Sequence, residues 1–179
     1  PPLAAFGRPG DFLLELFHGP TAAFKDYGAA FLAGCLAALP RGDKPLTIVV
    51  ATSGDTGAAV AAAFHGRPGF RVAILYPDGR VSPRQAHQLG AFGGNVRAFR
   101  VAGTFDDCQR LVKELFADSS FRAAHRVSSA NSINLLRWIP QAFYYFYGYC
   151  LWRQQTGGGR PVVVVPSGNY GNLSAGMLA

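Results

Sequence analysis

The sequence predicts an α/β fold, an open parallel sheet with helices on both of its faces. Two kinds of apolar pattern alternate along the chain. Short runs rich in β-branched residues are typical of buried parallel strands, and longer stretches with apolar residues three and four positions apart are typical of helices. Because strands that alternate with helices form successive βαβ units, we expect the strands to lie parallel in one sheet.

The first half of the chain supplies one helix and two strand–helix units. Thr21 is placed to cap a helix that carries Lys25 in its first turns. Residues 46–52, LTIVVAT, predict a strand that passes through a glycine turn into an alanine-rich helix. A second strand over 71–77 leads to a helix capped by Ser82, with proline at its first position and the glutamine of a capping box.

The second half continues the alternation with an aromatic helix that contains a proline. We expect that proline to kink the helix, because it lacks the backbone N–H donor. The predicted elements are a strand over 95–103, a capped helix over 104–118, a short strand near Val127, the aromatic helix over 133–152 kinked at Pro140, and a strand over 161–165 that ends in a glycine turn and a helix start.

Composition and charge disfavour several classes of protein. Of the 179 residues, 49% are hydrophobic and 15% are charged, which is typical of a globular chain. No apolar run reaches the roughly 18 residues of a membrane span. The net charge of +7 is spread without a dense basic run, so a small anionic ligand is favoured over nucleic acid.

Cysteine and histidine give no sign of a metal site. The three cysteines are far apart, and neither they nor the four histidines show metal-ligand spacing. We therefore expect buried free thiols in a reducing cytoplasm. The chain starts without Met and stops within a helical pattern, so we expect residues 1–179 to form an incomplete part of one catalytic domain, with two lobes left open for the longer protein.

Two glycine loops predict a site for anions. TSGDTG (52–57) and PSGNYGN (166–172) each follow a β-branched run and precede a helix. Ligands of open α/β sheets bind where strands end and helices begin, and glycines let the backbone approach them closely. Exposed N–H groups and the helix dipole favour an anion there. Neither loop matches a nucleotide signature, because GxxxxGK[ST] is absent and SGDTGAA lacks the first glycine of GxGxxG.

Lys25 is one of only three lysines and lies among apolar residues in HGPTAAFKD. One interpretation is a surface lysine that extends into solvent or pairs with Asp26 or Glu15. The other is an amine whose pKa is lowered by burial, so that it can act as a nucleophile. An amine and two anion-binding loops are what pyridoxal phosphate requires, for its aldehyde, its phosphate and a substrate carboxylate.

The sequence resembles threonine synthase, a pyridoxal-phosphate enzyme of the fold type II (tryptophan synthase β-like) group. Five motifs carry the resemblance in this order: ELFHGPTAAFKD, TSGDTGAAV, ILYPDGRVSP, SANSIN and VPSGNYGNLSAG. Together they extend from about residue 13 to the end. Members of this family are much longer, so the chain resembles their central portion.

The resemblance implies a role for each motif. Lys25 matches the Schiff-base lysine and is the expected catalytic residue. The expected cofactor-phosphate loop is Ser167, Gly168, Asn169, Tyr170, Gly171 and Asn172, and the expected loop for the substrate carboxylate and the cofactor ring is Thr52, Ser53, Gly54, Asp55 and Thr56.

Asp55 departs from the wider fold group, in which an asparagine usually faces the ring hydroxyl of the cofactor. An ionised carboxylate would repel that oxygen, so we expect Asp55 to be turned away or protonated. The segment NSINLLR offers Asn131, Ser132, Asn134 and Arg137 to the leaving phosphate of the substrate. The alternative is helix capping by Ser132 or Asn131, with Arg137 exposed to solvent.

The implied activity is that of a carbon–oxygen lyase in threonine biosynthesis. The full-length protein is expected to convert O-phospho-L-homoserine and water to L-threonine and phosphate with pyridoxal 5′-phosphate. A serine or threonine dehydratase, a Rossmann-type dinucleotide module and a non-catalytic remnant are the alternatives. We expect the 179-residue chain alone to bind the cofactor weakly or not at all and to turn over no substrate. Its exposed apolar surface is expected to favour association or poor solubility.

Overall fold

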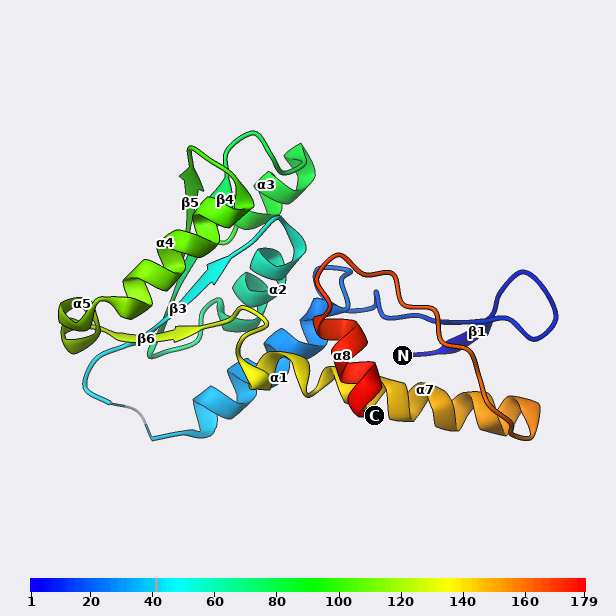
Figure 1. Cartoon of the computed structure of the whole chain (residues 1–179). Helices are drawn as coiled ribbons and strands as arrows, with labels where there is room; N and C mark the ends of the chain where they lie inside the picture. The colour runs from blue at the N-terminus through cyan, green and yellow to red at the C-terminus, as the bar shows by residue number, and fades with distance from the viewer. Residues whose placement is uncertain (41) are drawn as a thin grey trace.

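The computed structural model describes residues 1–40 and 42–179 and contains the expected parallel sheet. All of its neighbouring strands run parallel, in the order β5-β4-β3-β6 (Figure 1). The predicted α/β class is confirmed. The four strands are β3 (Leu46–Ala51), β4 (Phe70–Pro77), β5 (Val96–Val101) and β6 (Arg126–Ser129).

The register aligns the strands so that loops gather at one edge of the sheet. Leu46 of β3 lies opposite Phe70 of β4 on one side and opposite Arg126 of β6 on the other. The pairing of β3 with β6 ends at Val49 and Ser129, just before the loop that begins at Ala130. The carboxyl ends of both strands therefore open toward the same region.

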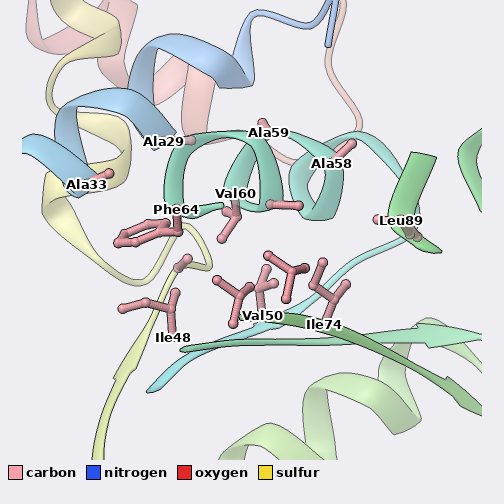
Figure 2. Packing of buried hydrophobic residues seen from close by; sticks show 14 of the residues in the cluster. Ala29, Ala33, Ile48, Val50, Ala58, Ala59, Val60, Phe64, Ile74 and Leu89 are labelled. Atoms are coloured by element: carbon pink, nitrogen blue, oxygen red, sulfur yellow. The ribbon is translucent and has the colours of Figure 1, made fainter. Parts of the chain in front are cut away.

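Helices cover both faces of the sheet. One face packs against α1 (Lys25–Ala38), α2 (Asp55–Phe64) and α3 (Pro83–Gly90). Figure 2 shows Phe64 and Val60 of α2 directed at Ile48, Val50 and Ile74 of the sheet, all fully buried. Burial of this apolar surface is the main source of stability for the layer.

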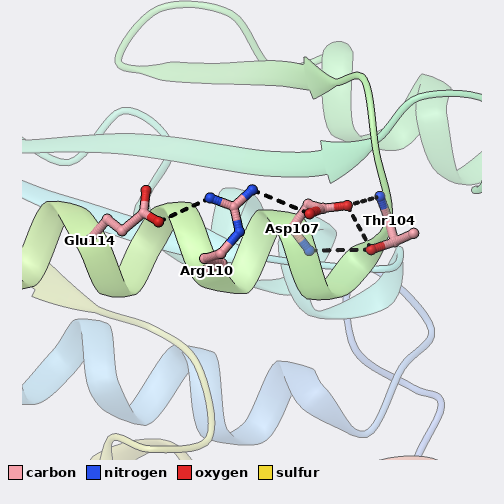
Figure 3. A network of polar contacts seen from close by, with 4 residues as sticks. All are labelled: Thr104, Asp107, Arg110 and Glu114. Carbon is pink, nitrogen blue, oxygen red and sulfur yellow. Dashed lines mark hydrogen bonds and ion pairs between the residues drawn. The ribbon is translucent and has the colours of Figure 1, made fainter.

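The opposite face packs against α4 (Phe105–Ala117), whose start is fixed by a capping box. The hydroxyl of Thr104 accepts a hydrogen bond from the backbone N–H of Asp107, and the Asp107 carboxylate accepts one from the backbone N–H of Thr104. Arg110 then bridges Asp107 and Glu114 on the exposed side (Figure 3). The predicted capping box at Ser82 and the predicted cap at Thr104 are confirmed, and the structure shows that Thr104 also forms a capping box. The short α5 (Ser119–Ala124) follows, capped by Asp118.

The aromatic segment is broken rather than kinked at Pro140. It forms α6 (Leu135–Trp138) and a separate α7 (Gln141–Thr156). Proline has no N–H for the i−4 carbonyl, and a new turn starts where the N–H of Phe143 donates to the Pro140 carbonyl oxygen. The helix α8 (Gly171–Leu178) returns to pack on α7 (Figure 1).

Residues 161–165 do not form the predicted strand. They run as an unpaired extended segment from the end of α7 back to α8, and Val162 is 92% exposed (Figure 1). A strand needs a neighbour to satisfy its backbone groups, and no strand in the described part of the chain lies beside these residues. A hairpin that the sequence did not predict, β1 (Leu3–Ala5) with β2 (Phe12–Leu14), lies near the N-terminus.

Helix α1 begins later than predicted. Its N-cap position is Phe24, without a side-chain cap, because the hydroxyl of Thr21 donates to Asp26 instead. The three cysteines are free, and only Cys108 is buried; Cys150 is exposed on α7, contrary to expectation. In the described residues, no helix is both long and apolar enough to cross a membrane.

Candidate active site

A cavity of about 120 Å³ opens at the carboxyl end of the sheet, where the starts of α1 and α2 meet α6 and α8. It joins parts of the chain that are far apart in sequence. Eleven predicted site residues line it: Lys25, Thr52, Ser53, Asp55, Thr56, Asn131, Ser132, Arg137, Asn169, Gly171 and Asn172. The five others, Gly54, Asn134, Ser167, Gly168 and Tyr170, are not among the lining residues.

Lys25 is half-buried at the first position of α1 and faces the cavity. Its Nζ lies 4.5 Å from the centre of the Phe24 ring. Burial lowers the pKa of Lys25 below its ordinary value; the negative charge of Asp55 opposes this shift and the positive charge of Arg137 adds to it. Neither alternative ion-pair partner is engaged with Lys25, because Asp26 bonds to Thr21 and Glu15 to His18.

Arg137 is 3% exposed, so its solvent-exposed alternative is wrong. Its Nη1 donates to the backbone carbonyl oxygen of Lys25 at 3.2 Å, and its Nε has no partner among the described residues. Burial lowers the pKa of Arg137 to about 10, while the charge of Asp26 acts in the opposite direction. A buried guanidinium with a free donor beside a cavity is suited to an anionic ligand.

Asp55 lines the same cavity as Lys25. It is the first residue of α2, and its Oδ1 accepts a hydrogen bond from Nε2 of Gln85 at 2.9 Å. Its charge raises the pKa of Lys25. In this arrangement Asp55 acts as a counter-charge to the amine.

The hydroxyl of Thr52 is committed to the loop itself. It is buried, donates to the carbonyl oxygen of Gly54, and accepts from the backbone N–H groups of Gly54 and Gly57. Gly54 has φ 145°, and a Cβ there would stand 2.4 Å from the amide nitrogen of Gln85. The loop is thus held in shape by Thr52, and Ser53 and Thr56 also line the cavity.

Asn172 is the buried anchor of the second loop. The hydroxyls of Tyr144 and Tyr145 on α7 both donate to its Oδ1. Burial raises the pKa of both tyrosines, which keeps them as neutral donors. Asn172 lies in the first turn of α8, where backbone N–H groups have no intrahelical acceptor, and the cavity reaches this turn.

Comparison with known sequences gives the family. The model of the family described as "Pyridoxal-phosphate dependent enzyme" matches residues 7–179. The chain belongs to this family. The Rossmann-type dinucleotide module is therefore not supported, and the predicted resemblance is confirmed.

Threonine synthases are strongly similar over almost all of the chain. The enzyme of Escherichia coli K12 is 52% identical over 166 residues, and that of Saccharomyces cerevisiae is 43% identical over 177 residues. Each alignment covers 93% of this chain but only 38% and 34% of the respective relative. The chain thus spans about two fifths of the length of the relatives it matches.

Solved structures in the family share the fold. The crystal structure of Escherichia coli threonine synthase superimposes with a TM-score of 0.89 at 48% identity, covering 99% of this chain and 41% of that one. The pyridoxal-phosphate-bound threonine synthase of Brucella melitensis gives 0.78 at 43% identity, covering 99% and 38%. Diaminopropionate ammonia lyase, at 18% identity and a TM-score of 0.68 over 91% of this chain and 46% of that one, shares the fold alone. This chain therefore has the fold of the fold type II pyridoxal-phosphate enzymes.

The asparagines of the SANSIN motif have mainly structural contacts. Asn131 pairs with the backbone of Ala51 through both amide atoms, at 2.7 and 3.1 Å, and so extends the contact between β3 and the loop after β6. Asn134 caps α6 by accepting from the N–H of Leu136, so the alternative of capping by Asn131 or Ser132 is wrong. Ser132 and Arg137 also line the cavity, and the Nε of Arg137 has no partner among the described residues.

Sequence reasoning missed Gln141, which lines the cavity and is 4% exposed. Its Nε2 donates to the carbonyl oxygen of Arg137, and its Oε1 has no partner in the described part of the chain. Gln85, Gln109, Phe24 and Phe105 also line the site. The signal for Gln141 was weak, because a glutamine one residue after a proline reads as an ordinary helix start.

The residues present fit pyridoxal phosphate. One amine with a lowered pKa shares a polar cavity with the first turn of α8 and with an unpartnered donor on Arg137. Lys25 would hold the aldehyde carbon, and the turn at Asn169, Gly171 and Asn172 would hold the phosphate.

Proposed function

We propose that the complete protein that contains this chain converts O-phospho-L-homoserine and water to L-threonine and phosphate. The observation that carries the proposal is the shared cavity, in which an amine of lowered pKa meets two loops suited to anions. The similarity to threonine synthases at 43–52% identity supports this substrate over that of a dehydratase. The three free cysteines further support a reducing cytoplasmic location.

Lys25 is the proposed general base. When bound, pyridoxal phosphate supplies an aldehyde that condenses with amines and a ring that takes up the electrons of a deprotonated carbon. Lys25 Nζ would take the proton from Cα of the substrate and move a second one from Cβ, since it is tethered beside both carbons. A lowered pKa favours this role, because the neutral amine is then more abundant near neutral pH.

The remaining residues orient the substrate. Arg137 would bind the phosphate that leaves Cγ, through the Nε that has no other partner among the described residues. Ser53 and Thr56 would bind the substrate carboxylate at the start of α2. Asp55 would hold a positive charge on Lys25 once the amine has gained a proton, because its carboxylate favours the ammonium form.

The decisive experiment compares the complete protein with its Lys25→Ala variant. The parent should release threonine and inorganic phosphate from O-phospho-L-homoserine, and borohydride should fix pyridoxal phosphate to the peptide that contains Lys25. Lys25→Ala should lose both. Cofactor fixed instead at Lys44 or Lys113 would contradict the assignment, and turnover of serine or threonine in place of the phosphorylated substrate would favour a dehydratase.

A further inference from the structure

Asp26 is a buried carboxylate to which the proposed reaction gives no role. It is the second residue of α1, directly after Lys25, and is 7% exposed. Buried charges need compensating hydrogen bonds. Asp26 obtains two from a single residue: its Oδ2 accepts from the backbone N–H of Thr21 at 3.0 Å, and its Oδ1 accepts from the Thr21 hydroxyl at 2.7 Å.

The turn that Asp26 holds is tight and strained. Ala22 has φ 56°, the one positive value outside glycine in the described part of the chain. Its N–H donates to the carbonyl oxygen of Gly19, where an added Cβ would lie 2.4 Å from Oδ2 of Asp26. A left-handed alanine persists only where the surroundings hold it. The carboxylate of Asp26 provides that hold, directly before the residues that carry Lys25 into the cavity.

The same first turn of α1 is fixed against α6. Arg137 donates to the carbonyl oxygen of Lys25, and a Cβ at Gly28 would lie only 2.1 Å from the carbonyl oxygen of Arg137. Arg137 forms no ion pair among the described residues. The charge of Asp26 raises the pKa of Arg137 and so favours the charged guanidinium against its burial.

We propose that Asp26, which does not itself line the cavity, is a positioning residue for the site. Its carboxylate fixes the turn over residues 19–24 to α1, and thereby sets the direction in which Lys25 enters the cavity. Asp26 also follows directly on Lys25, whose carbonyl oxygen accepts a hydrogen bond from Arg137, and its negative charge favours the charged form of that guanidinium. The inference rests on the proposed function only in that the cavity takes pyridoxal phosphate.

The test uses variants of the complete protein that separate the charge of Asp26 from its hydrogen bonds. Asp26→Asn keeps an acceptor of similar shape but removes the charge. Thr21→Val removes the hydroxyl bond but keeps the charge, and Thr21→Ser restores the hydroxyl. Asp106→Asn is the matched control, because Asp106 is an exposed carboxylate in the first turn of α4.

The main measurement is the concentration of pyridoxal phosphate at which borohydride fixes half of the Lys25 peptide, with thermal unfolding recorded for each variant. We expect Asp26→Asn to raise that concentration about tenfold and Thr21→Val about threefold. Thr21→Ser and Asp106→Asn should stay within about twofold of the parent. An equal rise of this concentration in Asp26→Asn and Thr21→Val would show that the charge of Asp26 adds nothing to its hydrogen bond with the Thr21 hydroxyl.

Several outcomes overturn the proposal. It is contradicted if the Asp26→Asn and Thr21→Val variants both fold and are both trapped at Lys25 at the same concentration of pyridoxal phosphate as the parent. If Asp26→Asn does not fold, Thr21→Val becomes the test. Trapping of Lys25 in that variant at the parental concentration of pyridoxal phosphate would then reject the positioning role of Asp26. Trapping does not require O-phospho-L-homoserine, so the result stands even if the complete protein acts on another substrate. A parent that is not trapped at Lys25 overturns both this inference and the proposed function.

Discussion

Nη1 of Arg137 donates a hydrogen bond to the backbone carbonyl oxygen of Lys25 at 3.2 Å, although the two residues are 112 positions apart. This contact joins the first turn of α1 to α6 and brings two cationic side chains into one cavity. Asp55 is the acidic side chain among the lining residues. The pKa of Lys25 is therefore shifted by two neighbouring charges of opposite sign, in addition to burial.

Arg137→Gln should make Lys25 less reactive near neutral pH. The positive charge of Arg137 lowers the pKa of Lys25, so its removal raises that pKa and leaves less neutral amine at a given pH. The rate at which the complete protein captures pyridoxal phosphate at Lys25 can be measured by borohydride trapping as a function of pH. We expect the pH profile of this rate to shift to higher pH in Arg137→Gln. A shift to lower pH would show that Arg137 does not act on the amine through its charge.

Asp55→Asn should shift the same profile in the opposite direction. The carboxylate raises the pKa of Lys25, so its neutralisation lowers that pKa further. Asparagine retains an oxygen that can accept from Gln85, so the link between α2 and α3 should survive. Opposite shifts in this variant and in Arg137→Gln, each measured with the same trapping assay, would show that the two charges act in opposite directions on one amine. Shifts of the same sign would instead indicate a general disturbance of the cavity.

Gly28→Ala should destabilise the fold far more than Gly34→Ala, although both glycines lie in α1. A Cβ at Gly28 would stand 2.1 Å from the backbone oxygen of Arg137, whereas at Gly34 nothing lies within 4 Å. We expect Gly28→Ala to lower the free energy of unfolding by about 1–3 kcal/mol or more, because backbone must move. Gly34→Ala should raise it by roughly 0.5–1 kcal/mol, since alanine favours the helix. Urea unfolding of both variants, side by side, measures the difference.

Local signals explain what the sequence could predict. The capping box at Ser82 depends on residues three positions apart, the cap at Thr104 precedes a strong helical pattern, and the strand over residues 46–51 depends on its own apolar run. The burial of Arg137 could not be predicted in this way, because it is produced by α1 packing on α6 across 112 residues. Its neighbours in sequence give no sign of that packing.

Roles among similar residues were equally hard to assign from sequence. Asn131 and Asn134 are both polar residues before a helix, yet one pairs with the backbone of Ala51 and the other caps α6. The choice depends on where β3 ends, which is tertiary information. Thr21 likewise satisfies the pattern of a helix cap, but the carboxylate of Asp26 is the stronger partner for its hydroxyl. Local patterns predicted the parallel sheet and the helices that cover it, whereas contacts between elements decided the roles of individual residues and left residues 161–165 without a neighbouring strand in the described part of the chain.

The 179-residue chain alone should self-associate through the unpaired segment at 161–165. Val162 and Val164 are 92% and 85% exposed, and Phe143 and Phe146 expose their rings on α7. An extended β-branched segment with free backbone groups is a template for pairing with another chain.

Val164→Lys should reduce the associated fraction in sedimentation velocity at least severalfold, because a charged side chain on the segment opposes pairing. Gln154→Lys adds the same charge at an exposed position of α7 and should leave association unchanged. Equal loss of association in both variants would mean that net charge, rather than the segment, controls it.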